Sequence, residues 1–402
     1  MMWLVTTIAA VDVPFYLPKE RIQRINSAAE MNVLLNSFDD CKEGSDWKAS
    51  VQRYEANEML EAFDRKQDLV HRRYKPEKCK EFVLRERGKT RPVKAPAIID
   101  RVVAKAHNQQ ILLPEIRKRV IYDNSASLKN RGNDFAKRRF ETHIHQNYRH
   151  RGNNGGFVFF GDNTKFFDNI PHSQLKEQFY AFCQSEDERW LTDVLIDAFQ
   201  PDVSYMTDEE YAGAMNVIYN SLEHVGYKGP REKLLAKSCN IGSETSQSGG
   251  VYYPHEIDNY FKIVLGVGPY GRYMDDTHIV GDSREELMEY EAIYKQKYRE
   301  YGLFVNERKT RICPLNKPFV WLKVKYILTD DGQLIRNLSH DAVVRERTRL
   351  KAYGRLVEAG ILPKEEAANA YRSWRGNATR HYDSYRTIGE LDKVAAKELG
   401  GF

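Results

Sequence analysis

The stretch Gly271–Val280 constrains this chain more than any other, because two adjacent carboxylates interrupt an apolar and aromatic run. The pattern predicts a hairpin with strand Gly271–Met274, a turn at Asp275-Asp276 and strand Thr277–Val280. Neighbouring acids repel each other, and burial makes this repulsion costly unless a cation lies between them. A solvated Asp-Asp turn is the alternative. The apolar flanks favour a half-buried tip, and hence a metal site that needs a third carboxylate.

The candidate for that third carboxylate is Asp162, which directly follows the apolar run Phe157–Gly161. An uninterrupted apolar run of this length is typical of a strand that is buried on both faces. Such a strand holds a side chain at its end in a fixed position, as a metal ligand requires. We therefore expect Asp162, Asp275 and Asp276 to form one site.

Basic residues gather in two segments that suit a negatively charged ligand. Residues 82–93 predict a hairpin with its turn at Arg87-Gly88, and strand alternation places Lys89 and Arg91 on one face. Two cations on one strand face suit a triphosphate, although an edge strand protected by charge is the alternative. The helix predicted at Asp134–Tyr148 is also basic and suits a nucleic-acid backbone, with a solvated face as the alternative.

Composition excludes few classes of function. The 402 residues carry a formal net charge of +5 and are 41% hydrophobic, which is typical of a globular protein with a mildly basic surface. The five cysteines are scattered without a CxxC pair, which favours a reducing compartment and argues against a zinc site. Met1–Val13 is too short to span a membrane and lacks the basic start of a signal peptide, so no membrane partner is expected.

The periodicity of apolar residues predicts the other elements. Helices are expected at Lys19–Leu35, Tyr54–Val70, Asp100–Ile116, Ser173–Phe182, Trp190–Phe199, Asp208–Leu222, Val251–Val264 and Arg284–Tyr301, and in a basic lobe from His340 onward. Strands are expected at Gly302–Asn306, Lys309–Ile312, Phe319–Ile327 and Gly332–Arg336. The small residues of Asn240–Gly250 predict a loop that lets the backbone approach another backbone or a base pair, with an ordinary capping loop as the alternative.

Five of these segments, taken in order, resemble the motifs of reverse transcriptases. They are the basic hairpin, Asp162 with Phe166-Phe167, the Gly-Ser-x-Thr-Ser-Gln sequence at 242–247, Tyr-Met-Asp-Asp at 273–276 and Leu-x-x-Asn-x-x-Lys at 303–309. Tyr-x-Asp-Asp alone is a weak signal, whereas five motifs in this order are specific. The resemblance covers roughly residues 54–399.

The resemblance implies an α+β right-hand polymerase fold, with fingers, a palm of antiparallel sheet with helices, and an α-helical thumb. The expected domains are an N-terminal extension at 1–50, fingers at 51–155, a palm at 156–338 and a helical thumb at 339–402. The palm would contain a finger insertion and a helical insertion at about 185–238. No RNase H, endonuclease or maturase domain is expected within these residues.

The same resemblance implies an RNA-directed DNA polymerase that extends a 3′-hydroxyl with dNTPs. Two Mg²⁺ ions, with Mn²⁺ as an alternative, would be held by Asp162 and Asp275 with support from Asp276. Lys309 would protonate the pyrophosphate leaving group, unless it is an ordinary surface lysine. Roles in dNTP binding are implied for Lys89, Arg91, Asn163, Phe167 and Gln247, with Phe167 as a bulky gate against a ribose 2′-hydroxyl. Primer and template contacts are implied for Gly242, Ser243, Tyr273, Met274, Trp321 and Leu322.

Within the superfamily, the loop that ends in Ser246-Gln247 resembles that of diversity-generating retroelements and of bacterial defence-associated and abortive-infection enzymes. Val320–Lys323 replaces the usual Phe-Leu-Gly of the primer-grip hairpin, and the Val-Thr-Gly signature of retron enzymes is missing. The unfamiliar segment Met1–Ala49, the long stretch between Asp162 and Gly242 and the altered primer-grip hairpin favour a cytoplasmic bacterial enzyme of anti-phage defence. Its partners would be a dedicated non-coding RNA template, the DNA product, dNTPs, and an accessory protein or a second copy of the chain.

Three alternatives remain open at this point. The first is mutagenic copying in a diversity-generating retroelement, which the loop motif fits equally well. The second is an RNA-templated RNA polymerase, against which Phe167 and Met274 argue. The third is a catalytically inactive RNA-binding scaffold, against which the complete set of three carboxylates argues, because an inactive palm has no need of mutually repelling acids.

Overall fold

The computed structural model describes residues 27–86, 89–224, 227 and 229–400. Helices and three antiparallel sheets make up these residues, so the α+β class is confirmed. The expected segment Met1–Val13 and the expected turn Arg87-Gly88 lie outside the described residues. None of the described helices combines the length and the apolar character that crossing a membrane requires.

The chain divides into two compact units, which are described separately. The first comprises the chain up to Glu115 together with His172–Pro201 and Asn240–Ser246. The second comprises Ile116–Pro171, Asp202–Cys239 and the chain from Gln247 onward.

The first unit is mainly helical. Its elements are a 3₁₀ turn at Ser27–Ala29, α2 (Met31–Lys42), α3 (Ala49–Ala56), α4 (Glu58–Val70), the antiparallel pair β1 (Lys80–Glu86) and β2 (Lys89–Ala95), α5 (Ile98–His107), α8 (His172–Tyr180) and α9 (Glu186–Asp197). A π-helical turn at Asn108–Leu112 follows α5 and leads into α6 (Leu113–Arg119). Asp100 was expected to cap α5, but the helix begins two residues earlier. Its buried carboxylate instead accepts hydrogen bonds from the Tyr74 hydroxyl at 2.7 Å and the Glu77 amide at 3.0 Å.

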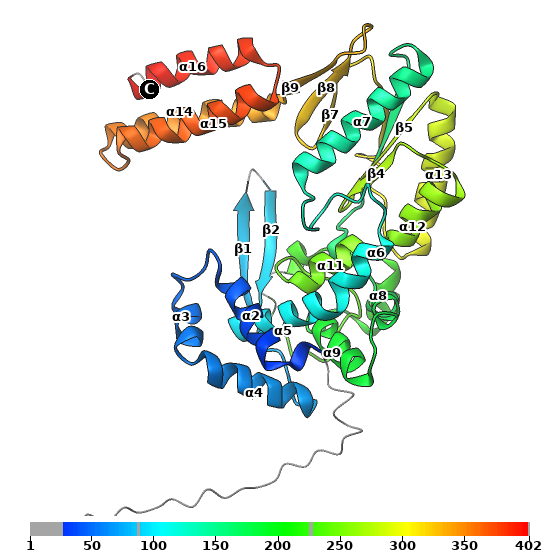
Figure 1. Ribbon diagram of the computed structural model, residues 1–402, viewed down its shortest axis with the longest axis vertical. Coiled ribbons are helices and arrows are strands. Elements are labelled where there is room, and N and C mark those ends of the chain that lie inside the picture. The colour runs from blue at the N-terminus through cyan, green and yellow to red at the C-terminus, as the bar shows by residue number, and fades with distance from the viewer. Residues whose placement is uncertain (1–26, 87–88, 225–226, 228, 401–402) are drawn as a thin grey trace, which may run out of the picture. The chain divides into compact units, whose positions relative to one another are not determined.

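The second unit is built on a four-stranded antiparallel sheet (Figure 1). Its strands are β3 (Phe157–Gly161), β4 (Tyr270–Tyr273), β5 (Asp276–Gly281) and β6 (Arg311–Pro314), in the order β4-β5-β3-β6. β3 matches the predicted strand residue for residue and is buried along most of its length. It pairs with β5 on one side and with β6 on the other.

Helices cover both faces of this sheet. On one face, Phe160 of β3 packs against Phe140 of α7 (Asn133–Arg151) in a cluster that also contains residues of a second sheet. On the opposite face, Phe159 packs against the ring of Tyr294 on α13 (Arg284–Glu300). The second sheet is formed by β7 (Phe319–Trp321), β8 (Val324–Leu328) and β9 (Leu334–Leu338). The alternation of Phe159 and Phe160 explains why β3 carries no polar residue.

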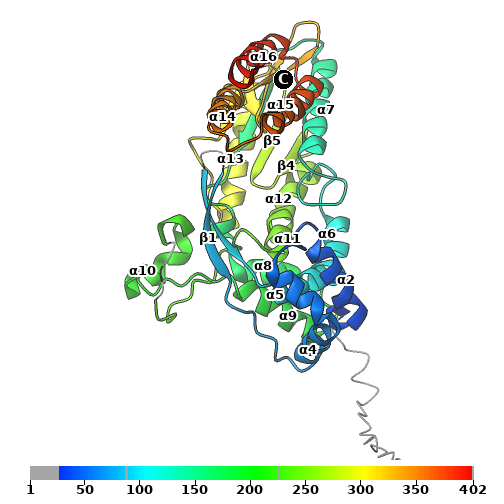
Figure 2. The ribbon, with the colours of Figure 1, turned by 90° about the vertical axis from the view of Figure 1, so that its left-hand side faces the viewer.

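The remaining helices lie after β3 in the chain. They are α10 (Asp208–Gly213), with short 3₁₀ turns at Ala214–Asn216 and Ser221–His224, α11 (Glu244–Tyr252), α12 (His255–Asn259) with a π-helical turn at Tyr260–Val264, α14 (His340–Glu358), α15 (Lys364–His381) and α16 (Tyr385–Leu399). The last three pack on one another around Leu350, Tyr371 and Leu391, and Figure 2 shows them together. The helical C-terminal lobe is thus confirmed.

Several expected elements differ in the structure. The strand expected at Phe319–Ile327 is the hairpin of β7 and β8, the helix expected at Tyr54–Val70 is interrupted at Asn57, and the described part of the helix expected at Lys19–Leu35 is an α-helix only from Met31. The helix expected at Val251–Val264 begins at Glu244, because the small residues there let the helix pack closely, and it is broken before Pro254. The helix expected at Asp208–Leu222 ends at Gly213. Gly302–Asn306 forms no regular strand and contributes a single bridge between Asn163 and Val305.

Gly161, the last residue of β3, leaves room for a buried ring. A Cβ at this position would lie 2.5 Å from Cζ of Tyr294, whose ring is fully buried and has no space to move. We expect Gly161→Ala to lower the free energy of unfolding by about 1–3 kcal/mol through overpacking, measured by urea denaturation.

The matched control is Gly376→Ala on α15, where a Cβ meets nothing within 4 Å. This change should raise stability by about 0.5–1 kcal/mol, because alanine suits a helix interior better than glycine. Equal effects of the two substitutions would contradict the packing assigned to β3.

Candidate active site

The β4–β5 hairpin has its turn one residue earlier than expected. Tyr273 pairs with Asp276, so the two turn residues are Met274 and Asp275, and Asp276 belongs to β5. Met274 has a φ of 55°, the positive value found at the first central residue of the tight hairpin turns. A non-glycine residue in this conformation costs about 1–2 kcal/mol, and such strain gathers at functional sites. The pairing of β4 with β5 continues as far as Tyr273 and Asp276, which leaves Met274 and Asp275 as the turn.

Strand register places Asp162 opposite this turn. Gly161 pairs with Thr277 and Phe160 with His278, so Asp162 follows β3 at the position across from Asp276. Residues that face each other in an antiparallel pair point to the same side of the sheet. This register brings Asp162 and Asp276 to the same end of β3 and β5, with Asp275 in the adjoining turn.

The segment that contains Lys309 is attached to Asp162. The Lys309 ammonium lies 2.9 and 3.1 Å from the two carboxylate oxygens of Asp162. The Asn306 amide donates to the Asp162 carbonyl at 2.8 Å, which positions the turn before β6. Because the Lys309 side chain is 57% exposed, the ion pair itself contributes little to stability, about 0–1 kcal/mol. The expected proton donor thus lies directly beside one of the three acids.

Phe167 and Met274 meet the helix α11 at Gly250. A Cβ on Gly250 would lie 2.7 Å from Cε1 of Phe167 and 3.5 Å from the Met274 sulfur. Only glycine allows this approach, so Gly250 determines where the half-buried Phe167 ring lies. Gly250 was expected in a loop and was not singled out as a site residue. The run of small residues around Gly250 is the sequence feature that could have indicated this close approach.

Asn163 and Trp321 face inward. The Asn163 side chain is buried and donates to the Tyr294 hydroxyl at 3.0 Å, so its amide group is engaged inside the protein and is not exposed for the expected role in dNTP binding. Trp321 was expected to grip a primer, but its side chain is 5% exposed and its ring packs 4.4 Å from that of Phe140. Trp321 therefore supports the β7–β8 hairpin from inside, while Leu322 forms part of its tip with a φ of 41°. Tyr273 is half-buried against the same cluster.

The expected phosphate and loop residues belong mostly to the first unit. Gly242 has a φ of 133°, and a Cβ there would lie 2.8 Å from the Lys94 carbonyl of β2. This close approach is what the small-residue motif was expected to allow, although the neighbouring backbone belongs to the protein itself. Ser243 is buried, and the register of β1 with β2 includes Lys89 and Arg91 in β2. Gln247 is exposed on α11.

A buried charge network lies beside β4. The Asp123 carboxylate accepts hydrogen bonds from Arg139 at 2.5 Å and from Lys262 at 2.9 Å, and His143 Nε2 lies 3.4 Å away. His143 Nδ1 is 3.0 Å from His278 Nε2 on β5. Arg139 was expected to face outward on a basic helix, so this is a correction: the buried Asp123 carboxylate draws it inward. The network joins α7 to the hairpin that carries the acids.

The network shifts the pKa values of its members. Burial alone would raise the pKa of Asp123, but His143, Arg139 and Lys262 outweigh it and hold that pKa well below its usual range. Burial lowers the pKa of His143, and the neighbouring Asp123 offsets this only in part. The folded protein thus favours an ionised Asp123 beside a neutral His143.

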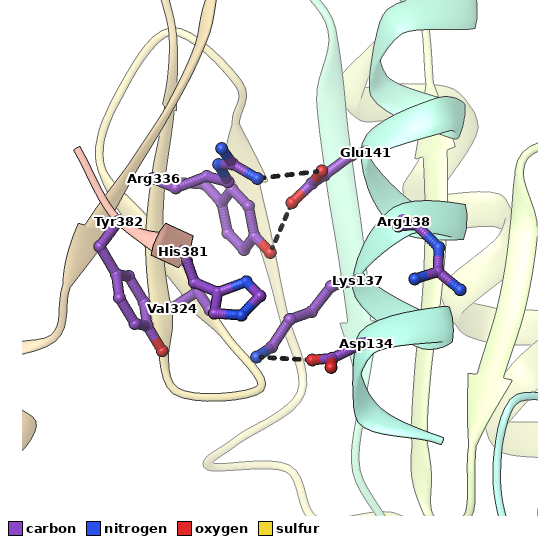
Figure 3. Close-up of a pocket in the computed structure, with 9 residues that line it drawn as sticks. Asp134, Lys137, Arg138, Glu141, Val324, Arg336, His381 and Tyr382 are labelled. Carbon is purple, nitrogen blue, oxygen red and sulfur yellow. Dashed lines mark hydrogen bonds and ion pairs between the residues drawn. The ribbon is translucent and has the colours of Figure 1, made fainter. Parts of the chain in front are cut away.

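A pocket of mixed charge lies where α7 faces β8 and β9 (Figure 3). Glu141 accepts from the Tyr326 hydroxyl at 3.3 Å and lies 3.9 Å from the Arg336 guanidinium. Lys137 lies 3.8 Å from Asp134 in the same pocket. Part of the basic face expected on α7 is therefore paired within the protein.

The donor set at the end of β3 and β5 fits a divalent cation. Carboxylate oxygens are the ligands that Mg²⁺ prefers, and a cation bound at Asp162 would compete with the Lys309 ammonium for this carboxylate. Across the described ranges, no group of three or more His, Cys, Asp or Glu side chains is arranged as a metal site. These residues therefore fit a divalent cation in the chemistry of their ligand atoms and in their positions on the strands.

Comparisons with known proteins agree with these motifs. The family model described as reverse transcriptase (RNA-dependent DNA polymerase) matches residues 74–326. The search of curated proteins found no match. Among solved structures, telomerase from Candida albicans in complex with a fragment of telomeric RNA is similar, with 12% identity and a TM-score of 0.43. The match covers 86% of this chain and 65% of that chain, so this chain spans less than two thirds of that relative.

The charge network predicts that acid weakens the fold. The pKa of His143 is lowered, so the unfolded chain binds a proton that the folded chain excludes once the pH falls through about 6.5. The lowered pKa of Asp123 acts in the same direction below about pH 4. We expect His143→Gln to flatten the fall in unfolding free energy between about pH 6.5 and 5.5 by up to ~1.4 kcal/mol per pH unit. Urea denaturation at several pH values measures this slope, and identical slopes would contradict a neutral His143.

Proposed function

This chain belongs to the reverse transcriptase (RNA-dependent DNA polymerase) family, and from that membership we propose that it extends a 3′-hydroxyl with dNTPs on an RNA template. Its fold is the α+β right-hand polymerase fold expected from the sequence, while the boundaries of fingers, palm and thumb stay predictions. The observation that carries the proposed activity is the register of β3 with β5, which aligns Asp162 with Asp276 beside the Asp275 turn.

The residues of the site have distinct proposed roles. Asp162, Asp275 and Asp276 would hold Mg²⁺ or Mn²⁺ ions, which when bound lower the pKa of the attacking hydroxyl and offset phosphate charge. The Lys309 Nζ proton is available to the pyrophosphate leaving group, since Lys309 is tied to Asp162. The Phe167 ring, seated on Gly250, would exclude a ribose 2′-hydroxyl. The protein's contribution is mainly positioning and electrostatics.

The biological role of the enzyme is a proposal separate from that of its chemical activity. We propose that the enzyme acts in the bacterial cytoplasm in anti-phage defence and copies a dedicated non-coding RNA, with an accessory protein or a second copy of the chain as partner. The Ser-Gln loop motif, the altered primer-grip hairpin and the insertion at about 185–238 support this role. The loop motif equally supports a diversity-generating retroelement.

Sequencing the nucleic acid that co-purifies with the chain separates these roles. One structured RNA with its DNA copy is the expected result. Transcripts of a repeat that recurs in a variable target gene would favour the retroelement instead.

Loss of the carboxylate of Asp275 or of Asp276 should abolish the activity. We expect Asp275→Ala and Asp276→Ala each to reduce Mg²⁺-dependent dNTP incorporation on a primed RNA template at least about a hundredfold, with little change in melting temperature. The matched control is Glu285→Gln, an exposed acid on α13, which should keep wild-type activity. Normal dNTP incorporation by either aspartate variant would contradict the assignment of Asp275 and Asp276 as metal ligands.

Phe167 and Gly250 should set the choice of sugar. We expect Phe167→Ala to raise the ratio of rNTP to dNTP use, measured as kcat/KM, about tenfold or more, because the ring that blocks the 2′-hydroxyl is removed. Gly250→Ala should alter the same ratio, because its Cβ forces the Phe167 ring to move. Gly213→Ala on α10, where a Cβ meets nothing within 4 Å, is the control and should leave the ratio unchanged. An unchanged ratio of rNTP to dNTP use in Phe167→Ala would contradict the role of Phe167 in excluding a ribose 2′-hydroxyl.

A further inference from the structure

Arg272, which lies two residues before Met274, the first residue of the turn, carries its charge in a buried position. Its side chain and that of its ion-pair partner Asp258 on α12 are both 0% exposed. A buried charge destabilises a protein unless a partner and hydrogen bonds offset the loss of water. The contacts of the Arg272 guanidinium therefore show which groups offset this loss of water.

All five N–H groups of the guanidinium have an acceptor. Nε lies 2.9 Å from each carboxylate oxygen of Asp258, and Nη2 lies 2.8 Å from Oδ2. The remaining donors reach three backbone carbonyls, which are Val251 at 2.6 Å, Gly250 at 3.2 Å and Met274 at 3.0 Å. The pair thus connects α12, the end of α11 and the turn itself.

The backbone of Arg272 is held in place by further hydrogen bonds. The Arg272 amide donates to the Asp123 carbonyl at 3.1 Å, and its carbonyl accepts from the Ser125 amide at 2.9 Å. The Asp258 carboxylate also accepts from the Tyr270 hydroxyl at 2.6 Å, but this hydroxyl makes no hydrogen bond to the guanidinium. The guanidinium therefore presents a fixed donor to Met274.

The Met274 carbonyl belongs to the peptide bond between Met274 and Asp275. A donor that fixes this carbonyl fixes the peptide plane, and with it ψ of Met274 and φ of Asp275. These two angles determine the direction in which the Asp275 carboxylate points. Met274 has a φ of 55°, so the turn has a conformation that methionine does not favour and that needs support from outside.

We propose that Arg272, held by Asp258, is a positioning residue that aims the Asp275 carboxylate and couples it to α11. The coupling reaches Phe167, because the same guanidinium binds the Gly250 carbonyl and Gly250 lies against the Phe167 ring. This inference rests on the proposed polymerase function for its effect on catalysis. The effect of Arg272 on the conformation of the turn does not depend on the proposed function.

The first test compares Arg272→Lys with Tyr270→Phe. Lysine keeps the charge beside Asp258 but lacks the planar fork that reaches several acceptors at once, so the bond to the Met274 carbonyl is lost. We expect kcat for dNTP incorporation to fall about 10- to 100-fold and the Mg²⁺ concentration for half-maximal rate to rise. Tyr270→Phe removes a hydrogen bond from the same carboxylate, so it should lower the melting temperature and leave kcat and the Mg²⁺ requirement unchanged.

A second readout needs neither metal nor substrate. The ¹³C-methyl signal of Met274, assigned with a Met274→Leu variant, reports the conformation of the turn directly. We expect this signal to shift in Arg272→Lys and to stay at its wild-type position in Tyr270→Phe. The double variant Arg272→Leu/Asp258→Leu removes both buried charges together, so it keeps the comparison possible where the single variant does not fold. Its Met274 signal should shift and its kcat should fall as in Arg272→Lys.

Different failures have different meanings. A wild-type chain without dNTP incorporation would refute the proposed function, while the Met274 signal would still test the positioning of the turn. An active wild type with unchanged kcat and Met274 signal in Arg272→Lys would overturn the positioning role. The positioning role would also be overturned if kcat fell in both Arg272→Lys and Tyr270→Phe in proportion to the fall in melting temperature. Arg272 would then contribute only to the stability of the fold.

Discussion

The antiparallel pairing of β3 with β5 is the constraint on which the site depends. Each backbone hydrogen bond of this pair fixes one step of the register, and the register alone decides that Asp162 lies across from Asp276. A shift by one residue would turn every side chain of β5 to the other face of the sheet. Such a shift would move Ile279 and Val280, which lie on opposite faces and are both buried, away from the side chains against which they pack. Burial of apolar residues thus holds the carboxylates in register.

Buried charges occupy both sides of the hairpin that carries two of these carboxylates. Asp258 balances Arg272 behind β4, and Asp123 balances Arg139 and Lys262 beside it. A hydrophobic cluster of similar volume would be at least as stable as a buried ion pair. The ion pairs, however, provide directional donors to specific carbonyls, which apolar side chains do not. Their presence next to a strained turn is consistent with a need for a defined conformation in this part of the reverse transcriptase.

Sequence reasoning worked best where one physical pattern dominated. The apolar run Phe157–Gly161 predicted β3 to the residue, since nothing but a strand buried on both faces suits it. It also worked for the charged amphipathic helix α13 and for the helical C-terminal lobe. It failed where tertiary contacts changed the local preference. The glycines before Val251 indicated a loop, yet they lie in α11 because a close approach to Phe167 requires them.

The amino-acid sequence by itself determined the α+β class, the central strand, and the set of acids and the lysine that gather at its end. It could not determine the register of the hairpin, because alternation in β4 and β5 allows the turn at either pair of residues. The structure decided this by pairing Tyr273 with Asp276, which places Met274 in the turn. It also decided that Trp321 and Arg139 face inward, because burial depends on partners that lie far away in the chain. Local sequence carries no information on such partners.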